Sequence, residues 1–492
     1  MPAIQALYVG NHISRKKHGF AQELSFCLQL ENRSYAKEVV VHWRDTTGRW
    51  HELAAQYAYS IDNGLDVWNT HTVIQQATLA ALPGDIVFYL RYTDQQQTYI
   101  DDLAGQYHRS AANSGISLCH DLPLLNLHFT PQIYQKQVFV PITVAVSRQL
   151  AAKSVTLLWT TDNWQSSFQT PCQAQKTRIG KHPPASQLWT AKLNIAEVFN
   201  LEYCVCAETA QGKFWDNHHG LNYRAKRKDL CLLILNLHCY QETEQDAKFS
   251  LIAKAIAERE VDIVCLQEVA EYWNDGQGDW PSNSANIINS RLPKPFHLVT
   301  DWSHRGFDQY REGVAILSRF PMTQTESRYV SASHDPFDIH SRKVVYAQID
   351  YPAIGSLNVF SAHLSWWENG FSEQYANLSA WAAEKDHPQS QATLLCGDFN
   401  VAAGSRGYDL IVRANEYEDQ FLSANAHGVF EKIFKVNDPY WQHSLDHDYR
   451  IDYVFMHKHS KLQVTSASVL FTEHDYGRVS DHCGYLLSFE PK

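Results

Sequence analysis

Two kinds of hydrophobic pattern divide the chain near residue 228. Before this point, short runs rich in β-branched and aromatic residues, such as residues 38–43 (EVVVHW) and 86–92 (IVFYLRY), are separated by Gly, Asp, Asn and Pro. After it, residues 230–236 (LCLLILN) form an apolar run typical of a buried strand, and residues 245–260 place their apolar side chains at helical spacing. The pattern predicts an all-β region followed by an α/β region.

The all-β region contains a sequence repeat. Residues 37–50 (KEVVVHWRDTTGRW) correspond to residues 153–164 (KSVTLLWTTDNW), and residues 98–108 (TYIDDLAGQYH) correspond to residues 213–223 (KFWDNHHGLNY), at an offset of about 115 residues. An offset of this size indicates duplication of a whole domain, and two tandem β-sandwiches are the simplest account. We therefore expect three domains, which are residues 1–112, 120–226 and 229–492.

Polar residues follow most of the predicted strands of the α/β region. The run 393–401 (TLLCGDFNV) shows the pattern well, because a buried strand ends abruptly in Gly397, Asp398, Phe399 and Asn400. Ligands of open α/β sheets bind at the carboxyl ends of strands, and residues two apart on an extended backbone point to the same side. A turn that merely closes a strand is the alternative.

Taken together, these strand-end residues form one set of amides, carboxylates and imidazoles: Asn236, Glu268, Glu312, His363, Asp398, Asn400, Asp452, Asp481 and His482. Oxygen ligands without cysteine favour Mg²⁺ or Mn²⁺ over zinc. Histidines accompanied by carboxylates favour acid–base chemistry on a phosphate ester, whose charge a metal would offset. Any one of these residues alone is more often a cap or a turn residue.

The order of motifs LNLH, LQEV, REGVAILSRFP, SAHL, GDFN, RIDYVF and SDH resembles the endonuclease/exonuclease/phosphatase superfamily over residues 229–490. The resemblance implies a four-layered α/β sandwich, in which two mixed sheets pack face to face and helices cover the outside. It also implies that Glu268 is the principal metal ligand, with Asn236 and Asp481 nearby. His482 is implied to be the general base that activates water, oriented by Asp452.

The resemblance implies further roles on the phosphate side of the site. His363 would contact the phosphate with support from Glu312, and Tyr310 stands in the place of a family tyrosine. Asp398 and Asn400 would position the nucleophile and bind the scissile phosphate. The implied mechanism is in-line attack of water on phosphorus.

One departure from the family concerns phosphate binding. Several nuclease members have a basic residue just after the metal-binding glutamate, whereas this chain has Val269, Ala270 and Glu271. Arg342 or Lys343 is the alternative phosphate ligand. The chain also carries a net charge of −11, and residues 229–492 alone carry −15. A general nucleic-acid binder needs a basic footprint, so the charge disfavours a DNase.

The end of the second β module resembles the WDNN-x-G-x-NY signature of family 21 carbohydrate-binding modules, which bind starch and glycogen. The residues concerned are Trp215, Asp216, Asn217, Asn222 and Tyr223. A flat indole can stack on a sugar ring while Asp and Asn side chains hydrogen-bond its hydroxyls. The alternative is that the aromatic residues are core and that Asp and Asn stabilise turns. The first copy has Ile100, Tyr107 and His108 instead and is expected to be degenerate.

Composition completes the prediction. No run approaches the roughly 18 apolar residues of a membrane span, and ten dispersed cysteines without a CxxC pair favour free thiols in the cytoplasm.

We expect a metal-dependent phosphoester hydrolase associated with glycogen-like or starch-like polysaccharide. The alternatives are a Mg²⁺-dependent nuclease, a sphingomyelinase-like lipid phosphodiesterase and a catalytically silent glycan-binding scaffold. Tryptophans after Glu268 and His363 could stack on a base or sugar, enter a lipid interface or close a loop: Trp273, Trp280, Trp366 and Trp367.

Overall fold

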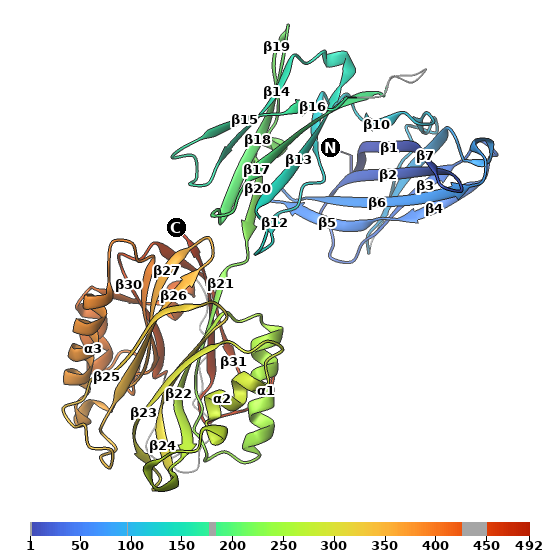
Figure 1. The fold of residues 1–492 in the computed structure, drawn as a ribbon. Helices are drawn as coiled ribbons and strands as arrows, with labels where there is room; N and C mark the ends of the chain where they lie inside the picture. Colours follow the sequence, from blue (N-terminus) through green and yellow to red (C-terminus); the bar gives the residue numbers. More distant parts are fainter. Residues whose placement is uncertain (1, 96, 177–183, 426–449) are drawn as a thin grey trace. The chain divides into compact units, whose positions relative to one another are not determined.

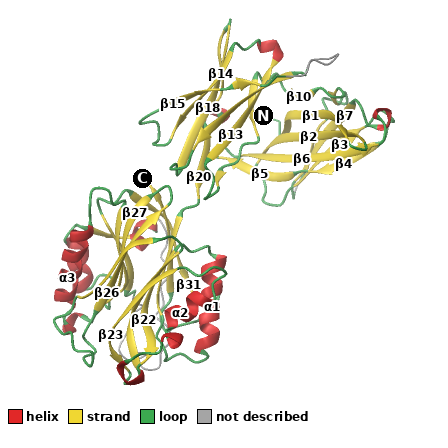
Figure 2. Cartoon of the chain, viewed as in Figure 1, coloured by secondary structure: helices red, strands yellow, loops and turns green. Residues whose placement is uncertain are grey.

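The computed structural model of the chain describes residues 2–95, 97–176, 184–425 and 450–492. It divides into two compact units, residues 1–228 and 229–492, as Figure 1 shows. The first unit is almost entirely strands, whereas the second combines strands with helices (Figure 2). The predicted order of an all-β region followed by an α/β region is therefore confirmed. None of the helices in the described ranges is long and apolar enough to cross a bilayer.

The first half of unit one consists of two sheets with an apolar core between them. Its strands are β1 (Ile4–Lys16), β2 (Gly19–Glu31), β3 (Glu38–Arg44), β4 (Trp50–Ala54), β5 (Gln56–Ile61), β6 (Leu65–Gln76), β7 (Ile86–Thr93), β8 (Thr98–Asp101), β9 (His108–Ser110) and β10 (Gly115–Leu118). One sheet has the order β10-β1-β2-β6-β5, and the other has the order β4-β3-β7-β8 with β9 also paired to β7.

The second half of unit one is built in the same way. Its strands are β11 (Leu124–Leu127), β12 (Gln132–Ile133), β13 (Phe139–Ser147), β14 (Ser154–Thr160), β15 (Phe168–Pro171), β16 (Gln173–Ala174), β17 (Ser186–Asn194), β18 (Asn200–Thr209), β19 (Gly212–Asp216) and β20 (Tyr223–Arg227). The sheet orders are β11-β13-β17-β16 and β12-β20-β18-β14-β15, with β19 also paired to β18.

The sequence repeat corresponds to a structural repeat. In the first half β7 pairs with both β8 and β9, and in the second half β18 pairs with both β19 and β20. The register agrees as well, because Trp43 lies opposite Phe88 and its counterpart Trp159 lies opposite Tyr203. Since pairing and register both repeat, the two halves are copies of one β fold.

The described residues of unit two form two six-stranded mixed sheets. The strands are β21 (Leu230–Asn236), β22 (Ile263–Tyr272), β23 (His297–Gly306), β24 (Tyr310–Ser318), β25 (Met322–Tyr329), β26 (Lys343–Tyr351), β27 (Gly355–His363), β28 (Ala392–Asp398), β29 (Tyr417–Asp419), β30 (Asp452–His457), β31 (Leu462–Leu470) and β32 (Gly484–Pro491). The sheet orders are β23-β24-β22-β21-β32-β31 and β25-β26-β27-β28-β30-β29.

Apolar contacts hold the two sheets and the helices together. The helices are α1 (Gln245–Glu258), α2 (Ser284–Ser290), α3 (Phe371–Lys385), α4 (Arg406–Arg413) and α5 (Gln420–Ala424). One core cluster joins residues from both sheets, among them Ile234 and Leu394. A second joins the first sheet to α1 and α2, and a third joins the second sheet to α3 and α4. Figure 1 shows α1 and α2 on one side of the unit and α3 on the other.

Candidate active site

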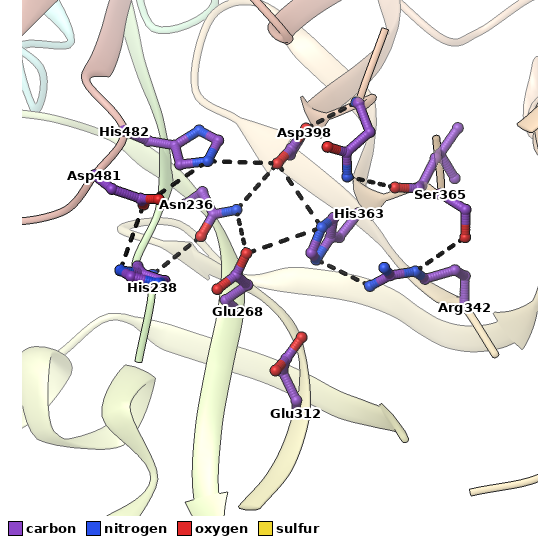
Figure 3. Close-up of polar contacts among 12 residues, drawn as sticks. Asn236, His238, Glu268, Glu312, Arg342, His363, Ser365, Asp398, Asp481 and His482 are labelled. Carbon is purple, nitrogen blue, oxygen red and sulfur yellow. Dashed lines mark hydrogen bonds and ion pairs between the residues drawn. The ribbon is translucent and has the colours of Figure 1, made fainter. Parts of the chain in front are cut away.

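The strand-end residues of unit two gather from both sheets. In the second sheet, His363 at the end of β27 lies beside Asp398 at the end of β28, and Asp398 lies opposite Asp452 at the start of β30. In the first sheet, Asn236 ends β21 beside Gln267 of β22. Asn236 Nδ2 donates to Asp398 at 3.1 Å across the two sheets (Figure 3). The structure thus brings together the residues that the sequence placed at strand ends.

Glu268 reaches the site because β22 bulges there. The pairing register of β22 with β24 shifts between Gln267 and Val269, which leaves Glu268 as the extra residue at a φ of 49°. A bulge re-aims the side chain that it carries, and a non-glycine residue in this region is strained. The Glu268 carboxylate accepts a hydrogen bond of 2.8 Å from Asn236 Nδ2. The bulge therefore turns this carboxylate toward the amide of β21.

Gly397 permits the close approach of strands at Asp398. Its φ is 129°, and a Cβ at this position would lie 2.1 Å from the carbonyl oxygen of Ala362 and 2.8 Å from Gln267 Nε2. Only glycine adopts this conformation without cost. Next to it, Asp398 Oδ1 accepts the backbone N–H of Asn400 at 2.8 Å. The GDFN sequence is both a turn and a means of fixing the Asp398 carboxylate.

His482 and Asp452 form a direct pair. His482 Nδ1 donates to Asp452 Oδ2 at 2.8 Å, and its Nε2 lies 3.8 Å from Asp398 Oδ2 and 3.9 Å from Asp481 Oδ1. Burial alone would lower the pKa of this imidazole, but the Asp452 carboxylate, followed by Asp398 and Asp481, raises it well above the ordinary value. The surroundings therefore stabilise the imidazolium form strongly.

His363 also lies near Asp398, but its ring is neutral. Arg342 Nη1 donates to His363 Nδ1 at 3.2 Å, which leaves Nε2 as the protonated nitrogen. That nitrogen lies 3.8 Å from Asp398 and 4.0 Å from Glu268. Burial, followed by the positive charge of Arg342, holds the pKa of His363 well below its ordinary value. His363 is therefore a neutral hydrogen-bond donor.

Two predicted residues also contact partners that the sequence did not indicate. Glu312, which was expected to support His363, lies 3.4 Å from His304 Nε2. Arg342, expected to contact phosphate, is buried to the same degree as His363, and its Nε donates to Ser365 Oγ at 3.3 Å. The supporting role of Glu312 and the phosphate contact of Arg342 stay predictions.

Two further predicted residues make local contacts. Asn400 Nδ2 donates to the backbone oxygen of Leu364 at 2.8 Å, so its amide nitrogen ties two loops together. Tyr310 packs against Tyr240 and Tyr272, at centroid distances of 5.2 and 5.5 Å, in the apolar layer beneath α1 and α2. No hydrogen bond joins Tyr310 to the cluster of carboxylates among the described residues.

The cluster has the properties of a divalent cation site. Burial, together with the neighbouring carboxylates Glu312 and Asp481, raises the pKa of Glu268 to about 8, and burial together with Asp452 raises that of Asp398 to about 7. Buried carboxylates that repel one another are relieved by a cation. Their oxygen atoms, together with the amide oxygen of Asn236, are the donors that hard divalent cations take. The residues present therefore fit such an ion.

Sequence reasoning missed a neighbouring group centred on His238. Its Nδ1 lies 2.8 Å from Glu242 Oε1 and 3.6 Å from Asp481 Oδ1, so these three residues form a second set of candidate metal ligands. The signal was the HxxxE spacing directly after the first strand. The pairing of His304 with Glu312 had no comparable signal, because the two residues lie on different strands.

The predicted sugar-binding residues of unit one divide into two groups. Trp215 is 46% exposed and Asn217 is also exposed, whereas Tyr223 is 2% exposed and lies in the core. Asp216 accepts 2.7 Å hydrogen bonds from the Tyr223 hydroxyl and from the backbone of Asn126. The prediction of a sugar contact is therefore wrong for Tyr223, because its ring fills the space between the sheets.

An exposed polar and aromatic group lies near Asn222. Glu202 Oε1 accepts hydrogen bonds from Trp164 Nε1 at 2.6 Å and from Asn222 Nδ2 at 2.7 Å. Trp164 is 37% exposed, and Arg224 Nε donates to the second oxygen of Glu202 at 3.2 Å. Asn222 is thus held beside an accessible indole ring.

Comparison with known proteins agrees with the geometry of unit two. The sequence profile described as the Endonuclease/Exonuclease/phosphatase family matches residues 233–482, just over half of the 492-residue chain. The chain belongs to the endonuclease/exonuclease/phosphatase family. Members of this family are phosphoesterases that generally use divalent metals, and the acidic and histidine clusters described above are compatible with such ions.

A second profile, the carbohydrate/starch-binding module (family 21), matches residues 130–226. The family domain is therefore preceded by a module of the glycan-binding type, as the sequence predicted. No curated protein matches the chain.

Solved structures are similar to about half of this chain over nearly their own full length. An endonuclease/exonuclease/phosphatase family protein from Leptotrichia buccalis is 24% identical, with a TM-score of 0.46, and the match covers 53% of this chain and 99% of that one. The mannosyl-6-phosphatase Bt3783 of Bacteroides thetaiotaomicron is 16% identical, with a TM-score of 0.41, and the same shares are covered. TDP2 of D. rerio in complex with single-strand DNA product is 16% identical, with a TM-score of 0.39, and the match again covers 53% and 99%.

Proposed function

We propose that this protein hydrolyses a phosphoester with the help of Mg²⁺ or Mn²⁺ while its second β module holds it to a starch-like or glycogen-like polysaccharide. The observation that carries the proposal is the pairing of His482 with Asp452 beside the buried carboxylates Glu268 and Asp398. A base, a donor and a cation site within one cluster are what hydrolysis of a phosphoester requires.

The proposed roles follow from protonation states. Asp398 and Asp481 favour the imidazolium of His482 while their charge is not offset. With a cation bound beside these carboxylates, His482 is the neutral base that takes a proton from the attacking water at Nε2, and Asp452 stabilises the imidazolium that forms. His363 donates its Nε2–H to a phosphoryl oxygen, with Arg342 fixing which nitrogen carries the proton. The cation, when bound by Glu268, Asn236 and Asp481, offsets the negative charge of the phosphate. Asp398 and Asn400 are assigned the roles predicted from the sequence, which are to position the nucleophile and to bind the scissile phosphate.

The proposed binding of polysaccharide rests on two exposed tryptophan rings. Trp164 and Trp215 are the exposed tryptophans of the described second module, and the hydrogen bond to Glu202 holds Asn222 beside the first of them. Indole rings next to amide and carboxylate groups have the chemistry that binds sugars. Asp216, paired with the buried Tyr223, stabilises the module instead.

We further propose three domains, residues 1–112, 120–226 and 229–492, and a four-layered sandwich for the last of them. The separate apolar clusters between the sheets and beneath each helical side support this layering. None of the ten cysteines, which all lie in the described ranges, forms a disulfide, and this supports a reducing compartment such as the cytoplasm.

A substrate panel tests the proposed activity. The full chain is incubated with Mg²⁺ or with a chelator on DNA, RNA, sphingomyelin, phosphoinositides and phosphorylated sugars. We expect metal-dependent release of product from at least one phosphoester, and no turnover on any of them would refute the activity. Co-sedimentation with glycogen tests the targeting, since Trp164→Ala and Trp215→Ala should each reduce the bound fraction whereas Phe307→Ala, which removes an exposed ring of unit two, should not.

A further inference from the structure

The first β module, which is the first half of unit one, carries an aromatic cluster on the outer face of one sheet. Burial alternates strictly along β7, so Phe88 and Leu90 lie in the core while Tyr89 faces outward. The ring of Trp50, on β4, lies 5.3 Å from the rings of both Tyr89 and Tyr107. These three residues form the Trp50 cluster, and none of them has a part in the functions proposed above.

The Trp50 cluster has surface available to a ligand. Trp50 is 37% exposed, and Tyr89 and Tyr107 are each only partly buried. Neither tyrosine hydroxyl has a hydrogen-bond partner in the described part of the chain, and neither is sealed from solvent. An indole and two phenols thus offer rings for stacking beside hydroxyl groups for hydrogen bonding. This combination of groups has the chemistry that binds sugars.

The same corner of the second copy holds a tryptophan and an amide. The sequence repeat aligns Trp50 with Trp164 and Tyr107 with Asn222. In the second copy, Glu202 joins the two aligned residues, because its Oε1 accepts a hydrogen bond from each side chain. That copy matches the carbohydrate/starch-binding profile. The Trp50 cluster therefore lies where a module of the glycan-binding type has an exposed tryptophan.

The first copy builds this corner from aromatic contacts in place of hydrogen bonds. The strand register assigns Val87 to the position of Glu202, and a valine side chain accepts no hydrogen bond. Tyr89, two residues further along the same face of the strand, contacts both Trp50 and Tyr107, at 5.3 and 5.9 Å. The residues of the motif differ between the copies, but the exposed tryptophan and its fixed neighbours are present in both.

Charges of both signs share this face of the sheet. Arg44 lies over the indole, 5.2 Å from the ring centroid, and Arg91 lies 3.5 Å from the exposed carboxylate of Glu38. The carboxylate of Glu52 is also exposed and lies 3.3 Å from His42 Nδ1. A polynucleotide that followed this face would meet two exposed carboxylates, whereas the hydroxyls of a neutral sugar chain can donate hydrogen bonds to them.

We propose that the Trp50 cluster is a second polysaccharide-binding site, so that each of the two β modules binds a sugar chain. The choice of an α-1,4-linked glucan as its ligand rests on the polysaccharide binding proposed above. Two sites on one chain raise the affinity for a polymer beyond that of either site alone, because the second contact with the same polymer is intramolecular.

Binding of a short glucan by a protein whose second module is disabled tests the inference. The full chain carrying both Trp164→Ala and Trp215→Ala is titrated calorimetrically with maltoheptaose. We expect one maltoheptaose to bind to this protein, and adding Trp50→Ala should weaken that binding about ten-fold or more. Tyr35→Ala, which removes a fully exposed ring of the same module outside the cluster, should retain it.

A second variant keeps the test independent of any effect of Trp50→Ala on folding. Tyr107 lies between β8 and β9 and belongs to neither strand, so Tyr107→Ala leaves the pairing of the sheet unchanged. It should also weaken the binding of maltoheptaose in the protein with the disabled second module. Unchanged binding in the Tyr107→Ala and Trp50→Ala variants would overturn the site.

The remaining outcomes separate this site from the one proposed in the second module. If the wild type binds maltoheptaose but the Trp164→Ala, Trp215→Ala protein does not, the first-module site is refuted and the second stands. If only Trp50→Ala weakens binding, the first-module site stands and targeting by the second module is refuted. A single-stranded DNA oligonucleotide that binds more tightly than maltoheptaose, with Trp50→Ala weakening it, would assign the cluster to nucleobases and overturn the inference.

Discussion

The guanidinium of Arg342 donates a 3.2 Å hydrogen bond to Nδ1 of His363. This contact decides the tautomer, because Arg is always a donor and Nδ1 must then accept. It leaves an Nε2–H directed at Asp398 and Glu268. From the sequence, His363 was predicted only to contact phosphate. The hydrogen bond from Arg342 further defines it as a donor through its Nε2–H.

Arg342→Gln is expected to reduce kcat about 10²-fold with little change in KM, because His363 loses its fixed orientation and tautomer. Steady-state kinetics on the substrate of the panel with the highest kcat/KM measure kcat and KM separately. Ser365→Ala, which removes the contacts to Arg342 Nε and Gln374 Nε2 but leaves the bond between Arg342 and His363, is the control and should have a much smaller effect. A rise in KM with kcat unchanged would show that Arg342 binds substrate directly.

Asp452→Asn is expected to lower kcat by about 10³- to 10⁴-fold, since a neutral amide does not stabilise the His482 imidazolium as the carboxylate does and its Nδ2–H favours the other tautomer of the ring. Combined with His482→Ala, it should cause almost no further loss because the two residues act as a unit. Independent, multiplicative losses in the double variant would contradict a shared role.

Glu268→Gln is expected to stabilise the metal-free protein and to weaken its response to Mg²⁺. The raised pKa of this carboxyl reports its burial and the repulsion from Glu312 and Asp481, which a neutral amide removes. In the wild type, Mg²⁺ should raise the melting temperature of unit two by a few degrees, corresponding to about 1–2 kcal/mol. An unchanged Mg²⁺ response in the variant would exclude Glu268 as a ligand. Glu326→Gln, on β25, serves as the control.

The stability of unit one is expected to fall as the pH is lowered toward 5 because of His218. Burial lowers the pKa of this imidazole to about 4, and its ring stacks on Tyr223 at 4.5 Å. A folded-state pKa below the unfolded value contributes stability that is present above pH 6.5 and is lost as the pH falls toward 4, by at most about 2 kcal/mol at pH 5.

Calorimetric melting of the full chain at pH 7.5 and 5.0 tests this. His218→Gln should show a smaller decrease in melting temperature than the wild type. The buried Asp216, whose pKa is raised, acts in the opposite direction but is present in both proteins. Equal decreases in the two proteins would contradict the role of His218.

The sequence predicted the sheets and the membership of the site because both depend on local patterns. Buried runs that end in Asp398 or Asn236 mark strand ends, and parallel strands bring such ends together. Contacts between residues on different strands escaped prediction. Nothing near Glu312 in the sequence indicates that it lies beside His304, since this follows from register and from a bulge in β23.

The sugar-binding prediction failed at Tyr223 for a related reason. The signature motif contains residues that shape the module as well as residues that face outward, and the sequence alone does not separate them. Strand alternation buries Tyr223 beside Tyr203, with their rings 5.2 Å apart, while Trp215 is exposed. The partner of Asn222, Glu202, lies 20 residues away on another strand.

We propose above that this family member is an active phosphoesterase whose base is His482. Release of p-nitrophenol from bis-p-nitrophenyl phosphate with Mg²⁺, compared among wild type, His482→Ala and His297→Ala, tests it most directly. His297 is exposed near the other end of β23 from His304, so its variant controls for loss of a histidine. We predict Mg²⁺-dependent turnover that His482→Ala reduces at least 10³-fold and His297→Ala leaves intact. Equal turnover by the wild type and His482→Ala would contradict the account.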